Sequence, residues 1–341
     1  MSIFFKNTLL KWHDPLERDL PWKTTNDPYK IWLSEVILQQ TRVDQGRPYY
    51  LKFVENYPNV KSFSEAPLSD VLRLWQGLGY YARARNMHLA AKQVIDQFNG
   101  VFPTFYNDLL KIKGVGPYTA AAISSFSINE PRAVLDGNVF RVLARFFNIN
   151  VPIDTNEGKL IFFNLANECL DKSMPGKYNQ AIMDFGALVC KPKNPNCMMC
   201  PLQNNCAAFF EKTISDLPVK SKKIIKKERF FLYQIVNREG SVAIQKRVER
   251  DIWQELFEFP VIEFNNQAEL LKSPLIAKDC DNVISLKQTL THQIIHGFFV
   301  FCGTKLQEDN NKGEVLWINS SELSKFAFPK IICQFLEGNY F

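Results

Sequence analysis

The sequence lacks any run of about 18 apolar residues, which excludes a membrane-spanning helix. Its first residues contain no apolar segment followed by a small-residue cleavage site, so we expect a protein that is not secreted and that works in the cytoplasm. It has no repeat of fixed period, and a single basic stretch is its only biased tract. A composition of 46% hydrophobic and 22% charged residues excludes collagen-like and disordered classes.

The chain has 341 residues, enough at about 150 residues per domain for two or three domains with cores of their own. Lysine and arginine total 41 against 35 acidic residues, a net charge of +6. This modest excess is compatible with a polyanionic partner and does not establish one.

Two regions of different character follow one another. From Asp27 to about Ala207 the sequence predicts successive amphipathic helices separated by short proline and glycine breaks. Between Lys220 and Arg229 six of ten residues are basic, and no apolar stripe crosses them, which indicates a linker. Beyond it, alternating segments at 230–236 and 297–301 predict strands, and residues 266–271 and 321–327 predict short helices. We expect a helical region and a separate α+β domain.

Four of the eight cysteines cluster near the end of the helical region, with the spacing C-x6-C-x2-C-x5-C: Cys190, Cys197, Cys200 and Cys206. Clustered thiols in an intracellular chain favour metal over disulfides, and four soft ligands imply zinc or an iron–sulfur cluster. The wide first gap fits paired zinc hooks poorly, and buried free cysteines are the alternative. The metal would be structural, since no ligand position is left open. We expect the scattered Cys169, Cys280, Cys302 and Cys333 to be buried.

A Gly-x-Gly turn, Gly114 to Gly116, separates a short helix from an apolar helix predicted over Thr119–Ser127. Glycines permit a positive φ and a close backbone approach, and the amides at the start of the next helix can hold a phosphate oxygen. This suits a DNA contact that ignores sequence. An ordinary connection between two helices is the alternative.

Glu35 lies in the middle of a helix that Asp27 and Pro28 begin as cap and first residue. Large apolar residues lie one turn before it and Leu38 and Gln39 one turn after, so burial would favour the protonated acid that general acid catalysis requires. A solvated surface charge is the alternative.

Asp136 precedes a helix that begins near Asn138, and it can cap that helix. A carboxylate held by helix amides stays ionised, and an anion is what a developing sugar cation requires nearby. Capping and catalysis are therefore compatible.

Taken in order, these segments resemble the MutY adenine DNA glycosylase family, part of the helix-hairpin-helix glycosylase superfamily that includes endonuclease III. The resemblance covers nearly the whole chain and includes the Gly114 hairpin and the four cysteines. The other matching motifs are Arg18-Asp19-Leu20-Pro21-Trp22, Ser34-Glu35-Val36-Ile37-Leu38-Gln39-Gln40-Thr41, Gly77-Leu78-Gly79-Tyr80-Tyr81-Ala82-Arg83-Ala84-Arg85-Asn86 and Leu135-Asp136-Gly137-Asn138.

The resemblance implies a mainly α, two-lobed glycosylase region over residues 1–216, with a six-helix lobe at about 28–135 and an iron–sulfur lobe at about 1–27 and 136–216. A basic linker over 217–229 and a Nudix-like α+β domain over 230–341 would follow. It also favours a [4Fe-4S] cluster over zinc. The implied activity is excision of adenine mispaired with 8-oxoguanine, or with guanine, in double-stranded DNA. We expect a monomer without membrane contact, nucleoid-associated if the source is bacterial.

Roles for individual residues follow from the same resemblance. Glu35 would protonate the flipped adenine at N7 and then help to activate water, while Asp136, positioned by Asn138, would stabilise the oxocarbenium-like sugar. Tyr118 matches the family's active-site tyrosine. Further residues would contact DNA or the lesion: Gln39, Leu78, Tyr80, Gly114, Gly116, Thr291 and His292.

Tyr118 also separates related activities, because endonuclease III has a lysine here for a Schiff base and strand cleavage, which tyrosine cannot perform. We therefore expect a monofunctional glycosylase. Two alternatives stay open, a bifunctional glycosylase and lyase like endonuclease III and a catalytically silent protein that binds damaged DNA.

The C-terminal region resembles the Nudix-like MutY domain that reads 8-oxoguanine, through the segment Arg250 to Pro260. The G-x5-E-x7-R-E-U-x-E-E-x-G-U box is missing, so we expect no pyrophosphate hydrolysis. Leu290-Thr291-His292 stands where many relatives have Phe-Ser-His, keeping the hydroxyl and the imidazole but not the aromatic ring.

Overall fold

The computed structural model describes residues 2–16, 18–221, 225–278, 283–304, 306 and 314–338. The chain divides into two compact units, a helical unit of Met1–Glu65 and Leu89–Lys223 and a second unit of Ala66–His88 and Ile224–Phe341. Among the described residues, none of the helices has the length and apolar character that a membrane span requires.

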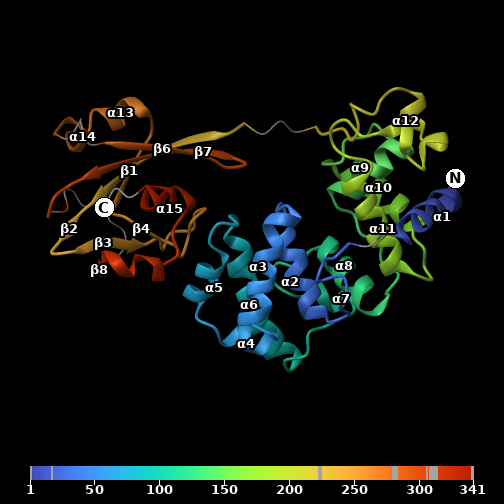
Figure 1. Ribbon diagram of the computed structural model, residues 1–341, viewed down its shortest axis with the longest axis horizontal. Helices are drawn as coiled ribbons and strands as arrows, with labels where there is room; N and C mark the ends of the chain where they lie inside the picture. Colours follow the sequence, from blue (N-terminus) through green and yellow to red (C-terminus); the bar gives the residue numbers. More distant parts are fainter. Residues whose placement is uncertain are drawn as a thin grey trace. The chain divides into compact units, whose positions relative to one another are not determined.

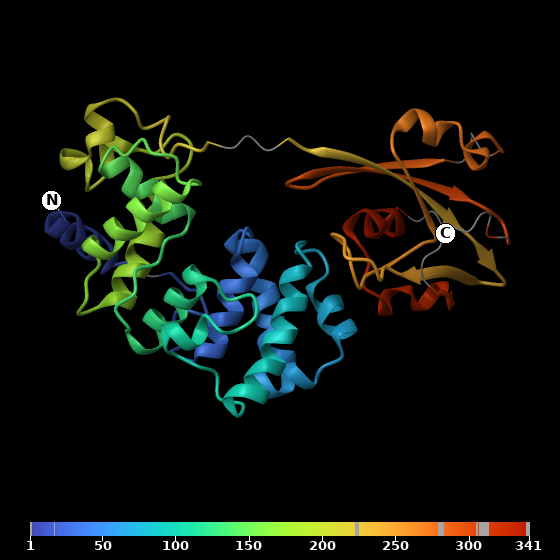
Figure 2. The ribbon, with the colours of Figure 1, turned by 180° about the vertical axis from the view of Figure 1, so that it is seen from behind.

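The elements of the helical unit are short helices joined by turns and by longer loops such as residues 147–155 and 189–196 (Figures 1 and 2). They are α1 (Ser2–His13), α2 (Pro28–Leu38), α3 (Val43–Asn56), α4 (Val60–Glu65), α7 (Tyr106–Leu109), α8 (Pro117–Ile128), α9 (Gly137–Phe146), α10 (Asn156–Cys169), α11 (Pro175–Leu188), η1 (Cys197–Met199), η2 (Gln203–Asn205) and α12 (Ala207–Phe210). The second unit contains α5 (Leu68–Trp75), and α6 (Ala82–Phe98) contributes residues to both.

Local capping explains where the helices of the site begin. The Asp27 side chain accepts a hydrogen bond from the Tyr29 amide at 3.0 Å, and Pro28 opens α2. Asp136 accepts from the Val139 amide at 2.7 Å at the start of α9. Both caps are confirmed predictions.

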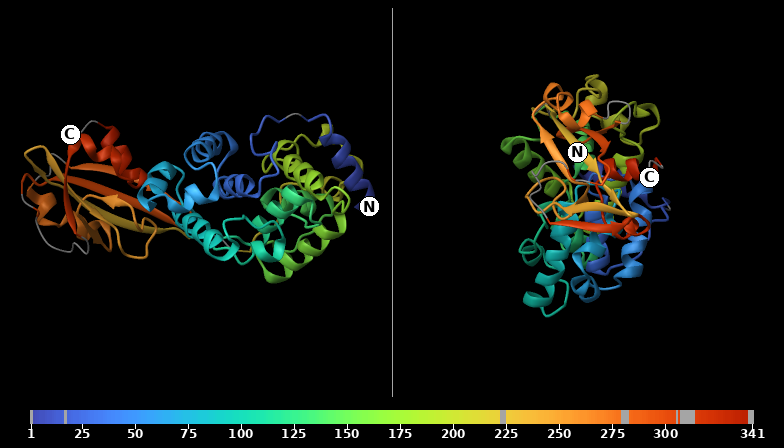
Figure 3. Two further views of the ribbon diagram at one scale, coloured as in Figure 1. Left: turned by 90° about the horizontal axis from the view of Figure 1, so that it is seen from below. Right: turned by 90° about the vertical axis from the view of Figure 1, so that its left-hand side faces the viewer.

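Helix α1 is an element that the sequence analysis missed. Its apolar residues Phe5, Leu9 and Leu10 are buried, and the Phe5 ring lies 4.6 Å from that of Phe146 on α9. The helix packs on α10 and α11 (Figure 3). Its helical state is stabilised by this packing, which a twelve-residue segment in water would lack.

The second unit contains two sheets, the first mixed and the second antiparallel. One has the order β5-β1-β7-β6, with β1 and β7 parallel, and the other joins β2, β3 and β4, with β8 paired to β3. The strands are β1 (Lys227–Ile235), β2 (Asn237–Arg238), β3 (Ser241–Lys246), β4 (Phe257–Glu258), β5 (Val261–Phe264), β6 (Ile284–Thr289), β7 (Gln293–Phe301) and β8 (Val315–Asn319). The helical elements α13 (Gln267–Leu271), α14 (Pro274–Lys278), η3 (Ser320–Lys325) and α15 (Lys330–Glu337) accompany them.

Successive side chains along β1 and β7 point to opposite faces of the first sheet, and each face packs against a helix. Phe230 and Leu232 join a buried cluster with Leu270 of α13, while Phe299 stacks on Phe335 of α15 with ring centroids 4.2 Å apart. Figure 1 shows α13 and α15 on opposite sides of this sheet.

The segment Ala66–His88 groups with the C-terminal elements through specific polar contacts. The Tyr81 hydroxyl donates to the Phe328 carbonyl at 3.3 Å, and the Arg85 guanidinium donates to the Gln254 carbonyl at 2.8 Å. The Phe328 amide donates to Gln76 Oε1 at 3.1 Å. The loop between α5 and α6 is thereby held beside the C-terminal strands.

The helical region and the α+β domain are as the sequence predicts, whereas the domain boundaries stay a prediction. β1 begins at Lys227, so the last residues of the predicted linker are strand, and Lys222 and Lys223 lie outside the described residues. Of the scattered cysteines, Cys169 is buried; Cys302, just after β7, and Cys333, which lines a pocket from α15, are only partly so. Cys280 lies outside the described residues.

Candidate functional site

A pocket of about 450 Å³ in the helical unit gathers the four residues predicted to be catalytic. Glu35 comes from α2, Tyr118 from α8, and Asp136 and Asn138 from the start of α9. Gln39 lines the same cavity, which we call the Glu35 pocket. Residues from three helices far apart in sequence thus face one space.

Glu35 has the surroundings expected of a general acid. It is only 8% exposed, and burial raises the pKa of its carboxyl to about 7, with a smaller upward contribution from Asp136. The Tyr118 hydroxyl donates to Glu35 Oε2 at 2.6 Å, which lowers this pKa and so moderates the shift. Burial and the Glu35 charge hold the pKa of Tyr118 well above its usual value, so the phenol keeps its proton and acts as the donor.

Asp136 is held at both carboxylate oxygens. Oδ1 accepts from the Val139 amide at 2.7 Å, and Oδ2 accepts from Asn138 Nδ2 at 2.8 Å. Burial raises the pKa of Asp136 above its ordinary value, and the bonds from Val139 and Asn138 lower it again in part. The expectation that helix amides keep Asp136 ionised is therefore incomplete, because it left out the burial that works against them.

Arg141, which the sequence analysis missed, fixes the orientation of the Asn138 amide. Its Nη2 donates to Asn138 Oδ1 at 2.8 Å and to the Gly186 carbonyl at 2.7 Å, and its Nε donates to the Cys190 carbonyl at 2.7 Å. Because Oδ1 accepts from Arg141, the Asn138 amino group must face Asp136. The available signal was Arg141 itself, three residues after Asn138 on a helix whose only other charged residue is Arg145.

Gly186 allows this arrangement by its lack of a side chain. A Cβ there would lie 2.6 Å from the Cβ of Asn138 and 3.0 Å from its carbonyl oxygen. Only glycine lets α11 approach the start of α9 this closely.

Asp184 is a buried carboxylate that the sequence analysis also missed. It accepts from Arg18 at 2.5 Å, bonds to Lys23, and lies 3.0 Å from the His13 ring. Burial would raise its pKa, yet these hydrogen bonds and the charges of Lys23 and Arg18 hold it at about 2. The cluster fastens His13, Arg18 and Lys23 to α11 at the wall of the Glu35 pocket.

The hairpin has the predicted shape. Gly114 has a φ of +78°, which favours glycine, and Gly116 caps α8 with Pro117 as its first residue. The apolar helix begins at Pro117, two residues earlier than predicted.

Gln39 and its neighbour differ in their placement. Gln39 is partly buried and donates to Thr119 Oγ1 at 3.2 Å, whereas Gln40 is exposed at a φ of +57°. Of the two, Gln40 is the side chain that projects into solvent at the border of the pocket.

Four of the seven residues predicted to contact DNA or the lesion meet in the second unit, whereas Gln39, Gly114 and Gly116 belong to the helical unit. Leu78, Tyr80, Thr291 and His292 line one pocket of about 440 Å³ together with Trp253. The hydroxyls of Tyr80 and Thr291 are hydrogen-bonded to each other. Leu78 is 7% exposed and Tyr80 43% exposed, so only the tyrosine presents a large surface.

The four clustered cysteines fit a soft-metal group by their chemistry. Burial, with a smaller electrostatic contribution from Cys190, raises the pKa of Cys197, and burial raises that of Cys200 to about 11. Arg145 Nη1 lies 3.5 Å from Cys190 Sγ, so a cation neighbours the thiols. Among the described residues, no three His, Cys, Asp or Glu side chains gather closely enough for a single metal ion.

Family models match both regions. Residues 33–159 match the HhH-GPD superfamily base excision DNA repair protein, and residues 232–338 match the NUDIX domain. Adenine DNA glycosylase of Buchnera aphidicola subsp. Acyrthosiphon pisum is 33% identical over 98% of this chain and 97% of its own length. The Arabidopsis thaliana adenine DNA glycosylase is 35% identical over 76% of this chain and 48% of its own.

Solved structures share the helical fold. A thermostable thymine-DNA glycosylase matches with a TM-score of 0.58 and 27% identity, covering 62% of this chain and 97% of that one. Endonuclease III in a non-covalent DNA complex matches with a TM-score of 0.54 and 21% identity, over 62% of this chain and 96% of its own.

Proposed function

The chain belongs to the adenine DNA glycosylase family, and we propose that it hydrolyses the N-glycosidic bond of adenine paired with 8-oxoguanine, or with guanine, in duplex DNA. It is a base excision repair glycosylase. The supporting observation is the buried Glu35 carboxyl, with a pKa of about 7, in a pocket that it shares with Asp136. To reach this acid, adenine must rotate out of the helix.

The chemistry follows from these two acids. Protonated Glu35 gives its proton to adenine N7, the bond from N9 to the sugar C1′ breaks, and the base leaves as neutral adenine. Positive charge develops on the sugar, and the Asp136 carboxylate stabilises it. Glu35, now ionised, accepts a proton from the water that attacks C1′.

Three groups keep the acids in place. The Tyr118 hydroxyl orients the Glu35 carboxyl, while Asn138 holds Asp136 Oδ2 and Arg141 holds Asn138. Small displacements of such groups are costly because the reacting atoms must be aligned.

The product is an abasic site in an intact strand. Tyr118 stands at the hairpin position where endonuclease III has its catalytic lysine, and a phenol has no amine that could form a Schiff base. The enzyme is therefore monofunctional.

The second unit reads the base opposite adenine. Thr291 and His292 are exposed at the pocket that Leu78 and Tyr80 also line, and they supply a hydroxyl and an imidazole for hydrogen bonds to 8-oxoguanine. Because the sequence lacks the Nudix box, this unit binds the base opposite adenine without hydrolysing a pyrophosphate.

Cys190, Cys197, Cys200 and Cys206 would hold a [4Fe-4S] cluster, which when bound cross-links the chain between α11 and α12. Through its carbonyl, Cys190 also accepts from Arg141, so the cysteine loop borders the support of Asp136. The enzyme acts as a monomer, without membrane contact, in the cytoplasm, at the nucleoid if the source is bacterial.

A single-turnover assay on a duplex with one 8-oxoguanine:adenine pair tests the proposal. We expect adenine release, with strand breakage only after alkali. Direct strand cleavage would indicate a lyase, and tight binding without release a silent binding protein. Glu35→Gln should abolish release and keep DNA binding; turnover by this variant would remove Glu35 from its role.

A further inference from the structure

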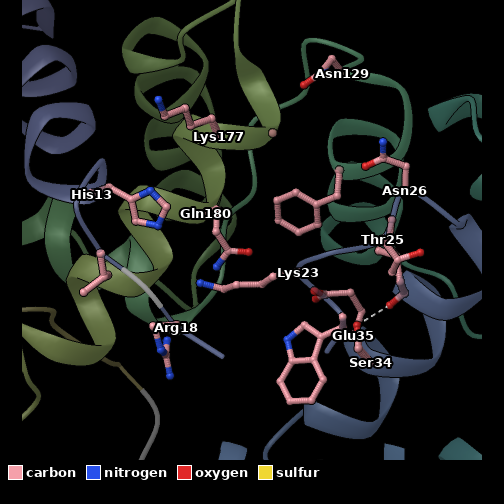
Figure 4. A pocket seen from close by; sticks show the side chains of 15 residues that line it. His13, Arg18, Lys23, Thr25, Asn26, Ser34, Glu35, Asn129, Lys177 and Gln180 are labelled. Atoms are coloured by element: carbon pink, nitrogen blue, oxygen red, sulfur yellow. Dashed lines mark hydrogen bonds between the residues drawn. The ribbon is translucent and has the colours of Figure 1, made fainter. Parts of the chain in front are cut away.

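A second pocket, of about 400 Å³, reaches Glu35 in the helical unit (Figure 4). Both cavities are lined by Arg18, Trp22, Lys23, Glu35 and Gln180. The second pocket also contacts Ser34, the neighbour of Glu35 on α2. The buried carboxyl of Glu35 is therefore a shared wall of two spaces.

The rims of the two pockets are formed by different residues. Asn26, Asn129 and Lys177 line the second pocket and are exposed, and none of them lines the Glu35 pocket. Figure 4 shows Asn129 and Lys177 at one end of the second pocket and Glu35 at the other. The Glu35 pocket is bordered instead by residues 39–41 and the start of α9. Each cavity thus has its own path to solvent.

The lining of the second pocket suits a neutral purine. The partly buried ring of Phe126 and the indole of Trp22 offer aromatic contact. Gln180 and Asn129 carry amides that can donate to and accept from the edge of a base. Among the described residues of this lining, Glu35 is the only carboxylate. Of the four basic side chains there, those of His13, Arg18 and Lys23 bond to Asp184, and that of Lys177 pairs with Asp14.

We propose that the second pocket is the exit for the excised base. Free adenine, released from its sugar at Glu35, leaves past Asn129 and Lys177 while the abasic duplex still covers the Glu35 pocket. This rests on the proposed function, in which DNA delivers adenine through the Glu35 pocket. The exit removes the need for DNA to dissociate before the base departs.

Retention of the base tests the exit. The enzyme excises the target adenine, which carries the label, from a duplex in a single turnover. The complex of enzyme with abasic duplex is then isolated by rapid gel filtration. We expect the wild-type complex to have lost its label while the duplex is still bound. Label that stays until the duplex dissociates would overturn the proposal.

Variants that narrow the rim of the second pocket are compared with a control variant elsewhere on the surface. Lys177→Trp places an indole at the rim, and the double variant Asn26→Trp/Lys177→Trp narrows it further. Lys159→Trp is the control, since Lys159 is exposed on α10 and lines neither pocket. Label per abasic site should escape about tenfold more slowly from the double variant than from the control. Equal escape from the two would refute the exit.

A binding measurement separates this inference from the activity. A second experiment follows over time the uptake of labelled adenine by the enzyme saturated with a duplex that carries a stable abasic analogue, with rapid gel filtration at each time point, and it requires no base excision. We expect adenine to enter this complex, and to enter it more slowly in the double variant. Exclusion of adenine from the wild-type complex would overturn the exit, even if the enzyme proved fully active as a glycosylase.

Discussion

Replacing Glu35 by glutamine should stabilise the helical unit at alkaline pH while it abolishes base release. The folded chain holds the Glu35 proton up to a pH of about 7, whereas the ordinary value is 4.5. Between these values the folded state binds more protons than the unfolded state, so stability falls as the pH rises. The amide at position 35 does not titrate, so the variant lacks this dependence.

The magnitude follows from the pKa shift. Each pKa unit corresponds to about 1.4 kcal/mol, so ionising Glu35 should cost wild-type protein about 2.5 kcal/mol between pH 5 and pH 8. For a unit of this size, that difference corresponds to roughly 5–10 °C in Tm. Any constant effect of the amide, such as an extra buried N–H, cancels when the two pH values are compared.

The measurement is the Tm of both proteins by far-UV circular dichroism at pH 5 and pH 8. We expect the Tm of Glu35→Gln relative to wild type to rise from the lower to the higher pH. A difference between the two proteins that is the same at both pH values would refute the assignment of Glu35 as a buried acid with a raised pKa.

Three further predictions concern the groups around the pocket. Tyr118→Phe removes the hydroxyl that lowers the Glu35 pKa, so the alkaline limb of the pH profile of single-turnover base release should move about one unit higher; a limb that stays or moves lower contradicts this. Arg141→Ala frees the Asn138 amide to turn and should slow base release about ten- to a hundredfold; because Glu35 keeps its surroundings, the pH profile should keep its shape, and unchanged release would show that Arg141 does not position Asn138. Asp184→Asn leaves the charges of Arg18 and Lys23 without a counter-charge. Because folding lowers the pKa of Asp184 from 3.8 to about 2, its ionised carboxylate stabilises the wild-type fold by about 2 kcal/mol at neutral pH, and the variant should lose this stability. The stability difference between wild type and Asp184→Asn should shrink as the pH falls from 3.8 towards 2. A difference in Tm between the two proteins that persists at acid pH would contradict this prediction.

Local features of the site could be predicted from the sequence because a few neighbouring residues encode them. The caps of α2 and α9, the positive φ at Gly114 and the end-to-end order of helices and strands all depend on side chains within one or two turns. The resemblance then named the residues that these elements bring together, and the structure places Glu35, Tyr118, Asp136 and Asn138 around one pocket.

Residues whose role depends on partners distant in the sequence were found only in the tertiary structure. Arg141 matters because Gly186 and Cys190 lie against it from α11 and the cysteine loop, and Asp184 because three basic side chains, those of His13, Arg18 and Lys23, converge on it. The sequence showed the side chains but not these long-range partners.

The sequence by itself determined which groups can do the chemistry: an acid on an apolar helix, a capping aspartate, a tyrosine at the hairpin position of the lyase lysine, and four spaced thiols. The tertiary structure alone decided how strongly those groups are perturbed. Burial sets the pKa of Glu35 and works against the amides at Asp136. The reason is physical, since desolvation depends on atoms that distant segments supply when they pack, whereas a cap or a turn depends on its nearest neighbours along the chain.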